Sequence, residues 1–361
     1  MLVVLNRGAE GSAAMAVCEL VRGQGLPAVP VEFSAGTVVV IPAEKVPGEL
    51  AGRLRTLPGV CRIVEGRSGY PLADRRLRPE GSCVALGAAA IGPRGFAVLV
   101  DAWEISPAAP ELVEVAAQAG AVGVVFSLPA AETGAGRVAL LQTVRELRRA
   151  GGPAVGVEIG SQAELELAGG LVDFLRIPAE RMQDFRLLHA AGRQPKPVVL
   201  DRGRSATLEE FLLAAEYILS GGNDRVLLCE RGIRSFDPAT GRATLDLAGA
   251  VRLTELTHLP VLVNPDAVGL GGEGFERVVR MAAVAGLQGA VVPVSADGVR
   301  PGTIAATRLR PLVASLAALL HLEQRPLVVL SGMDPEASLA GGWRGTTASS
   351  ISEVGAPTKS G

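Results

Sequence analysis

The fold is decided by residues 197–231, which read PVVLDRGRSATLEEFLLAAEYILSGGNDRVLLCER. Two short apolar runs, PVVLDR and RVLLCER, stand at its ends, and they are as continuous as parallel strands buried on both faces require. Between them, Thr207 and Glu210 fit a capping box, in which a hydroxyl and a carboxylate each accept a hydrogen bond from a backbone N–H at the start of a helix. This stretch predicts a strand, a helix and a second strand.

The same alternation of apolar run and helix extends from Phe96 to about residue 325. A second capping box, Ser161–Glu164, begins another helix, and the last helix is expected over 304–322. Eight strand–helix units in about 230 residues predict a closed (β/α)8 TIM barrel of the α/β class. A doubly wound open sheet is the alternative, but no GxGxxG or Walker-type loop follows a strand, which weighs against it. The eight apolar runs are FAVLVD, VGVVFS, AVGVEI, FLRIP, PVVLDR, RVLLCER, PVLVNP and GAVVPVS.

Residues 1–66 read strand–helix–strand–strand–helix–strand, which predicts a small ferredoxin-like α+β domain before the barrel. It serves either as a dimerising or barrel-packing module or as a ligand sensor. Residues 67–95 predict a linker and a short hairpin that plugs the bottom of the barrel, which takes residues 96–325. We expect the tail, 326–361, to be largely disordered from about Gly345, because it is rich in Gly, Ser and Thr and has little apolar surface.

The composition excludes several classes of partner. The 361 residues carry a net charge of −2, which leaves no basic footprint for nucleic acid or for an anionic membrane. The longest apolar run, Leu312–Leu322, has 11 residues, whereas a bilayer-spanning helix needs about 20. The start of the chain has no basic leader, so we expect a cytoplasmic protein. In that reducing compartment the four cysteines are expected to be buried free thiols; they are Cys18, Cys61, Cys83 and Cys229.

Residues 201–247, DRGRSATLEEFLLAAEYILSGGNDRVLLCERGIRSFDPATGRATLDL, resemble the 3-deoxy-D-arabino-heptulosonate 7-phosphate (DAHP) synthases that carry an N-terminal ferredoxin-like domain. The resemblance covers the chain up to about Val299 and is strongest from Met182 to Pro265. It implies the first step of the shikimate pathway of aromatic amino-acid biosynthesis, an aldol-type transfer that condenses phosphoenolpyruvate with erythrose 4-phosphate. It also implies a divalent metal such as Mn2+ at the carboxyl ends of the barrel strands.

The metal ligands that the resemblance implies are mostly replaced in this sequence. The family's cysteine falls on Trp103, its histidine on Ala267 and its glutamate on Pro293. A further histidine falls on Ser295, and only an aspartate is kept, as Asp297. One or two carboxylates do not make a transition-metal site of useful affinity. We therefore expect no metal and no other cofactor, and the tryptophan either plugs the pocket or stacks on a planar ligand.

The phosphate-binding bases that the resemblance implies are replaced as well. An arginine, a lysine and a second arginine fall on Val125, Ala130 and Glu132. A third arginine falls on Glu180, although the neighbouring arginine could take its place through a one-residue shift, and the lysine for phosphoenolpyruvate falls on Asp201. Together these exchanges make the barrel mouth less positive by about eight charge units, which would repel two phosphates.

A charged cluster remains at the expected strand ends. It consists of Glu158, Arg202, Glu230, Arg231 and Arg234. In the resembling family, the arginine at the position of Arg231 helps to bind phosphoenolpyruvate. Two interpretations stay open. Either the arginines and glutamates at 158, 202, 230 and 231 form a closed ion-pair network that stabilises the mouth, or Arg231 and Arg234 are a remnant anion site.

Three functions stay open for such a chain. The leading hypothesis is a pseudoenzyme, a non-catalytic paralogue that acts as a regulatory subunit in a homo- or hetero-oligomer. Its expected partner is an active DAHP synthase or another enzyme of the shikimate pathway. The second hypothesis is an active DAHP synthase that works without a metal. The third is a repurposed barrel in which Glu158, Asp201, Glu230 and Asp266 act as acid–base groups on a cationic or neutral substrate.

Overall fold

The computed structural model describes most of the chain. The predicted disorder of the C-terminal tail concerns residues that it does not describe. No helix in the described part is long and apolar enough to cross a membrane. The described residues are 1–6, 8, 10–34, 36–43, 45–66, 68–104, 108–127, 135–236, 243–270, 272–295 and 302–330.

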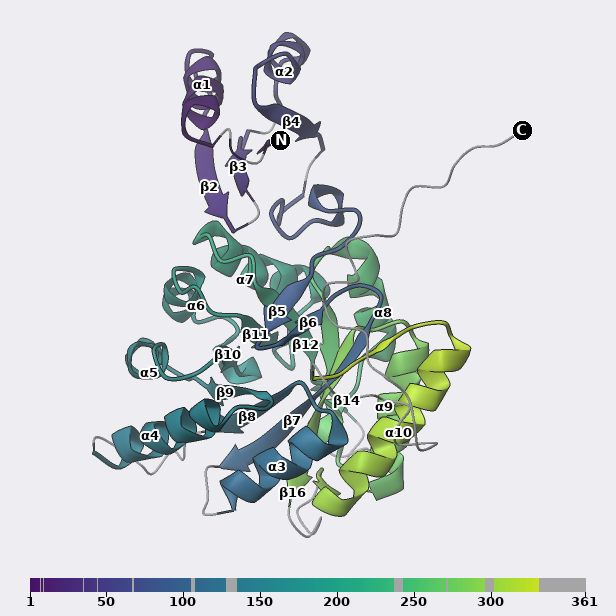
Figure 1. The fold of residues 1–361 in the computed structure, drawn as a ribbon. Helices are drawn as coiled ribbons and strands as arrows, with labels where there is room; N and C mark the ends of the chain where they lie inside the picture. Colours follow the sequence, from purple (N-terminus) through teal and green to yellow (C-terminus); the bar gives the residue numbers. More distant parts are fainter. Residues whose placement is uncertain are drawn as a thin grey trace.

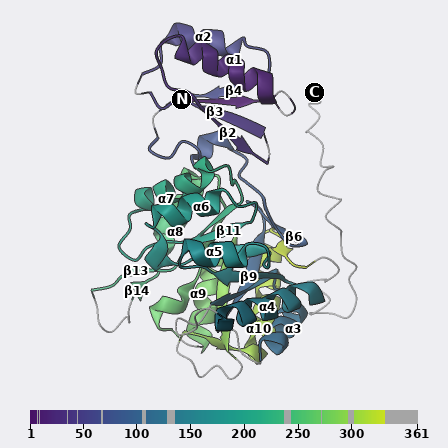
Figure 2. The same cartoon turned by 90° about the vertical axis from the view of Figure 1, so that its left-hand side faces the viewer.

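The N-terminal residues form the predicted ferredoxin-like unit. Its four strands make one antiparallel sheet in the order β2-β3-β1-β4. Both of its helices lie on the face of this sheet that is turned away from the barrel (Figure 2). The elements are β1 (Leu2–Leu5), α1 (Glu10–Arg22), β2 (Val29–Phe33), β3 (Gly36–Val40), α2 (Gly48–Arg55) and β4 (Val60–Val64).

The two faces of the N-terminal sheet pack against different partners, because successive side chains of a strand point to opposite sides. Val3 and Val39 belong to a small core shared with α1 and α2. Leu2, Val31 and Val38 instead join the large core that continues into the barrel. Because side chains alternate between the two faces of the sheet, one face packs its apolar side chains against the barrel domain and so joins the two domains.

The barrel is closed. Its eight strands pair in parallel with their neighbours, and the last, β16, pairs with the first, β7, from Gly289↔Ala97 to Pro293↔Asp101. This closure confirms the TIM barrel, and the open-sheet alternative is wrong. The strands are β7 (Phe96–Glu104), β8 (Gly123–Ser127), β9 (Ala154–Glu158), β10 (Phe174–Ile177), β11 (Val198–Asp201), β12 (Val226–Glu230), β15 (Val261–Val263) and β16 (Gly289–Ser295).

In the part of the chain that the structure describes, eight helices surround the strands (Figure 1). The capping box of Thr207 and Glu210 is formed at the start of the seventh helix. At Ser161, the hydroxyl accepts a hydrogen bond from Glu164 N, but the Glu164 carboxylate accepts from Gly160 N rather than from Ser161 N. The helices are α3 (Ala109–Ala119), α4 (Ala135–Ala150), α5 (Gln162–Ala168), α6 (Phe185–Gly192), α7 (Leu208–Ser220), α8 (Leu247–Leu256), α9 (Gly272–Val284) and α10 (Ala306–Leu322). Short pieces complete the described fold: Arg75–Leu77, Ala179–Arg181 and Pro265–Val268 are 3-10 turns, and β13 (Ile233–Arg234), β14 (Ala243–Thr244), β17 (Ile304–Ala305) and β18 (Leu327–Val328) are two-residue strands.

A hairpin fills the amino-terminal end of the barrel. It consists of β5 (Val84–Leu86) and β6 (Ala89–Ile91), whose buried side chains share one core with inward-facing barrel residues such as Phe174. The Phe174 ring needs a glycine opposite it, because a Cβ on Gly156 would lie 2.6 Å from ring atoms. The interior is thus packed from the bottom, and only the opposite end is left for polar groups.

The prediction that all four cysteines are buried is wrong for two of them. Cys18 and Cys229 are buried, whereas Cys61 and Cys83 are exposed. Cys61 lies on β4, an edge strand of the N-terminal sheet, and Cys83 precedes the plug hairpin. Neither position is covered by other elements on all sides, so both thiols stay exposed although cysteine side chains are apolar.

Candidate functional site at the barrel mouth

Charged side chains converge at the carboxyl ends of the barrel strands. Asp101 lies on β7, Glu158 ends β9, Arg176 lies on β10, Asp201 ends β11 and Arg231 follows β12. In a (β/α)8 barrel this end of the strands carries the ligand-binding site. The geometry here is therefore what decides which ligands the mouth can accept.

Arg176 lies at the centre of this cluster and is 1 % exposed. Its Nη1 donates to Asp101 Oδ2 at 2.5 Å, and its Nε donates to the two Asp201 oxygens at 3.2 and 3.0 Å. Burial opposes the charged guanidinium, but the adjacent Asp201 and Asp101 carboxylates outweigh it and raise the pKa of Arg176 well above its ordinary value. The arginine is therefore a fixed buried cation.

Arg231 is held by two carboxylates. Its Nε and Nη2 donate to Asp266 at 3.0 and 2.6 Å, and its Nη1 donates to Asp201 Oδ2 at 3.2 Å. Asp201, which is completely buried, thus bridges Arg176 and Arg231. Opposite charges alternate along this cluster, and we call it the mouth network; its members are Asp101, Arg176, Asp201, Arg231 and Asp266.

A second network lies beside the first and is built around Arg202. The Arg202 Nη1 donates to Glu230 Oε2 at 2.8 Å and to Asp246 Oδ2 at 2.9 Å. Its Nε and Nη2 donate to the Ala206 carbonyl at 3.0 and 2.9 Å, and Glu230 Oε1 accepts from Gly232 N at 2.7 Å. Asp246 also caps the start of α8, so this network ties the loops after β11 and β12 to a helix.

Glu158 is more open to solvent than Asp101 and Asp201, the two aspartates that bind Arg176. Its side chain is 24 % exposed, and its Oε2 lies 3.9 Å from Arg176 Nε. Burial raises the pKa of Glu158 to about 7, an effect that Arg176 opposes and Asp201 reinforces. Near neutral pH this carboxyl group is partly protonated, so it can both donate and accept a proton.

At the positions where the resemblance implies metal ligands, the described residues do not offer the donor atoms that the family's divalent metal would need. The backbone N of Trp103 donates to Asp101 at 3.0 Å in a left-handed turn with φ 56°, and Pro293 lies in β16. Ala267 belongs to a 3-10 turn, and Ser295 Oγ hydrogen-bonds Thr303 Oγ1 at 3.0 Å. Within the described residues no group of three His, Cys, Asp or Glu side chains could hold a metal ion. Asp297, the expected remnant ligand, lies outside these residues.

The remaining predicted positions are scattered. Val125 is buried in β8, and Glu180 is exposed in the turn after β10. Ala130 and Glu132 lie outside the described residues. Arg234 is exposed on β13 and belongs to neither network. Among the residues predicted for the site, the structure therefore brings together Glu158, Asp201 and Arg231 in the first group and Arg202 and Glu230 in the second.

Sequence reasoning missed three charged residues that complete these networks: Arg176, Asp101 and Asp246. A signal for the first was present, because an arginine inside the apolar run FLRIP cannot be buried without a carboxylate partner. Asp101 lies on the first barrel strand, close enough to accept a hydrogen bond from Arg176. The pairing itself needs the strand register, in which Arg176 lies opposite Glu158 on β9.

Comparisons with known proteins agree with the fold and with the barrel. The family model described as "DAHP synthetase I family" matches residues 129–299. The chain is 33 % identical over 254 residues to phospho-2-dehydro-3-deoxyheptonate aldolase of Thermotoga maritima, which covers 68 % of this chain and 74 % of that protein. It is 32 % identical over 200 residues to 2-dehydro-3-deoxyphosphooctonate aldolase of Syntrophotalea carbinolica, covering 53 % and 71 %.

The structural comparison extends over both domains. The crystal structure of the Thermotoga maritima DAHP synthase superposes with a TM-score of 0.68 at 28 % identity, over 90 % of this chain and 98 % of that one. A truncated form of the same enzyme gives a TM-score of 0.66 at 29 % identity, over 72 % and 100 %. By the length and identity of these matches, the chain belongs to the DAHP synthetase I family.

Proposed function

We propose that this member of the family does not catalyse the condensation of phosphoenolpyruvate with erythrose 4-phosphate, and that it is a regulatory subunit of an active DAHP synthase. One observation carries the proposal. Arg231, which matches the arginine that helps the family bind phosphoenolpyruvate, has its donors directed at Asp201 and Asp266. A substrate anion would have to displace these carboxylates.

The electrostatic cost of such a displacement is large. Two unit negative charges 4 Å apart repel by about 4 kcal/mol at an effective dielectric constant of about 20. Phosphoenolpyruvate carries a carboxylate and a phosphate, so its entry beside Asp201 and Asp266 brings several such terms. Arg176 does not offset them, because it is already neutralised by Asp101 and Asp201. Affinity for the family's anionic substrate is therefore expected to be negligible.

The proposed role as a subunit is supported by what the chain retains. The helical exterior surrounds the barrel, and the N-terminal sheet stays packed against it through Leu2, Val31 and Val38. A barrel that keeps its exterior while its mouth is filled by ion pairs is suited to binding a protein rather than a phosphorylated metabolite. A cytoplasmic location, beside the shikimate enzymes, is part of the same proposal.

The test is consumption of phosphoenolpyruvate in the presence of erythrose 4-phosphate and Mn2+. The purified chain is assayed alone, an active DAHP synthase of the same organism is assayed alone, and the two are assayed as a mixture. An unrelated protein at equal concentration replaces the chain in the control. We expect no turnover by the chain and a changed rate or inhibitor response in the mixture. Turnover by the chain alone, after expression in a host that lacks its own DAHP synthases, would refute the proposal.

A second function is favoured by Glu158. The mouth network and Glu158 together bring four carboxylates against two arginines, and the pKa of Glu158 is raised to about 7 by burial. This arrangement favours acid–base chemistry on a cationic substrate. Calorimetric titration with spermidine as the probe, on the wild type and on Glu158→Gln, tests it. Saturable binding that the substitution weakens about tenfold would support a repurposed barrel.

A further inference from the structure

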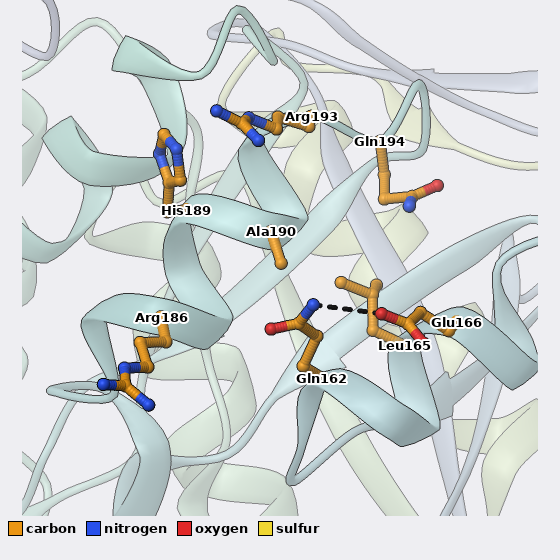
Figure 3. A pocket seen from close by; sticks show the side chains of 8 residues that line it. All are labelled: Gln162, Leu165, Glu166, Arg186, His189, Ala190, Arg193 and Gln194. Atoms are coloured by element: carbon orange, nitrogen blue, oxygen red, sulfur yellow. Dashed lines mark hydrogen bonds between the residues drawn. The ribbon is translucent and has the colours of Figure 1, made fainter.

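An open cleft lies on the outside of the barrel, between α5 and α6. It encloses about 340 Å³. Its floor contains Leu165 and Ala190, and polar side chains stand around them (Figure 3). The lining residues are Gln162, Leu165, Glu166, Arg186, His189, Ala190, Arg193 and Gln194. None of them belongs to the mouth network, so this cleft is a separate feature of the surface.

The α6 side of the cleft is basic. Arg186 and His189 stand at positions i and i+3 of α6, and Arg193, the residue that follows its last turn in a helical conformation, continues the same side of the helix at i+7. Within the described part of the chain no carboxylate lies at ion-pair distance from either arginine. The one acidic residue of the lining is Glu166, on α5, and its carboxylate accepts a hydrogen bond from Gln162 Nε2 at 3.0 Å (Figure 3). The α6 side of the cleft therefore carries two arginines and a histidine, whereas the α5 side carries a single carboxylate.

An exposed aromatic pair borders the same face of α6. The rings of Phe185 and Tyr217 lie 4.6 Å apart and the residues are 49 % and 44 % exposed. Phe185 precedes His189 by four residues, so the two side chains are neighbours on the helix. Aromatics make up 3 % of this chain, yet two of them lie together on its surface. Exposed aromatic side chains beside arginines are typical of protein interfaces.

We propose that this cleft binds an acidic helical segment of a partner protein. Carboxylates at i, i+3 and i+7 of the segment would face Arg186, His189 and Arg193, and an apolar side chain would pack on the aromatic pair. The two arginines are seven positions apart, from α6 to its C-cap, which is about 10 Å along the helix axis and matches two turns of a partner helix. A buried metabolite is the weaker alternative, because small-molecule sites are mostly apolar and enclosed, whereas this lining is polar and open.

The inference deepens the proposed function and rests on it for the partner, but the surface can be tested separately. The probe is a fluorescein-labelled, alanine-based helical peptide with glutamates at i, i+3 and i+7 and one leucine. Its anisotropy is titrated with the wild type, with R186E/R193E, and with a matched control, R149E/R310E. Arg149 and Arg310 are exposed on α4 and α10, so the control makes the same change in net charge. Far-UV circular dichroism checks that all three proteins are folded.

We expect binding by R186E/R193E to be weaker by about tenfold or more, with the control within about twofold of the wild type and with affinity falling as salt rises. Equal weakening in both double variants would overturn the proposal, since net charge alone would then explain binding. Displacement of the peptide by phosphoenolpyruvate at low concentration would overturn it in favour of a small-anion site.

The mixture with an active DAHP synthase separates this inference from the proposed function. If R186E/R193E loses both the peptide and the effect on the synthase, the cleft is the docking surface of that partner. If it loses the peptide while the wild type has no effect on the synthase, the acidic-segment site stands and the proposed partner is wrong. If it keeps the peptide, the site is wrong whatever the synthase does.

Discussion

Replacement of Arg176 by methionine tests whether the mouth network is closed to water and stabilises the folded barrel. Methionine has a similar length and fills most of the same space, so the change removes the charge and leaves little cavity. Asp201 is 0 % exposed and keeps Arg231, whose Nη1 lies 3.2 Å from it. Asp101, 3 % exposed, loses the guanidinium that lies 2.5 Å from its carboxylate. One carboxylate is thus left buried beside an apolar side chain.

The magnitude follows from this burial. Removing one partner of a buried ion pair costs about 3–5 kcal/mol, because the remaining charge is uncompensated. The total stability of a typical domain is about 5–15 kcal/mol, so the loss is a large fraction of it. We expect the free energy of unfolding of Arg176→Met, from urea denaturation followed by far-UV circular dichroism, to fall by about 3–5 kcal/mol, and the Tm to fall by roughly 10 °C.

A matched control is provided by Arg148, which pairs with Asp173 at 2.6 Å but is 38 % exposed. The same substitution there, Arg148→Met, should cost about 0–1 kcal/mol, as surface ion pairs do. Replacing Asp101 by asparagine in the Arg176→Met background should recover part of the loss, since it removes the orphaned charge. Equal small losses in the two single variants would refute the reasoning, because they would mean that water reaches Arg176.

Three further predictions concern titration and packing. Burial raises the pKa of Glu158 from 4.5 to about 7, so the stabilisation of its protonated form is present below 4.5 and is lost as the pH rises through about 7. Relative to Glu158→Gln, the wild type should lose about 3 kcal/mol between pH 5 and 8 in urea unfolding. Burial lowers the pKa of His258 from 6.5 to about 4, so stability present above pH 6.5 is lost as the pH falls towards 4, and His258→Asn should show a flatter acid limb in the same assay. Gly156→Ala should lower the free energy of unfolding by about 1–3 kcal/mol because its methyl group meets the Phe174 ring, whereas Gly170→Ala, which meets nothing within 4 Å, should change it little.

The sequence predicts the barrel well because each of its elements is encoded locally. Runs such as PVVLDR and RVLLCER are long enough and apolar enough to be strands buried on both faces, and Thr207 with Glu210 marks the start of α7. The number of units then selects the closed barrel. The bounds differ by one or two residues where the chain changes from one element to the next, as at residues 304–305, which form β17 rather than the first turn of the last helix.

The mouth is less predictable, because its chemistry depends on pairs that are far apart in the chain. Arg176 contacts Asp101 across 75 positions and Asp201 across 25 positions. Such a pair cannot be recognised from the separation of its residues in the sequence or from the spacing of apolar residues. It depends on the height of each side chain along the axis of the closed barrel. The aspartate at position 201, where the resemblance implies a lysine, is visible in the sequence, but its contact with two arginines is not.

Asp201 supplies the negative charge that lies between the two arginines of the mouth. A lysine at position 201 would stand beside both Arg176 and Arg231, and three adjacent buried cations would require an anion between them. An aspartate at that position supplies the anion from the protein itself, because its two oxygens accept from both guanidinium groups. Arg231 then serves the stability of the mouth. Under the proposed function, an arginine at the position of Arg231 is therefore not sufficient for phosphoenolpyruvate binding, because the residue that ends the preceding strand, here Asp201, decides whether that arginine is free.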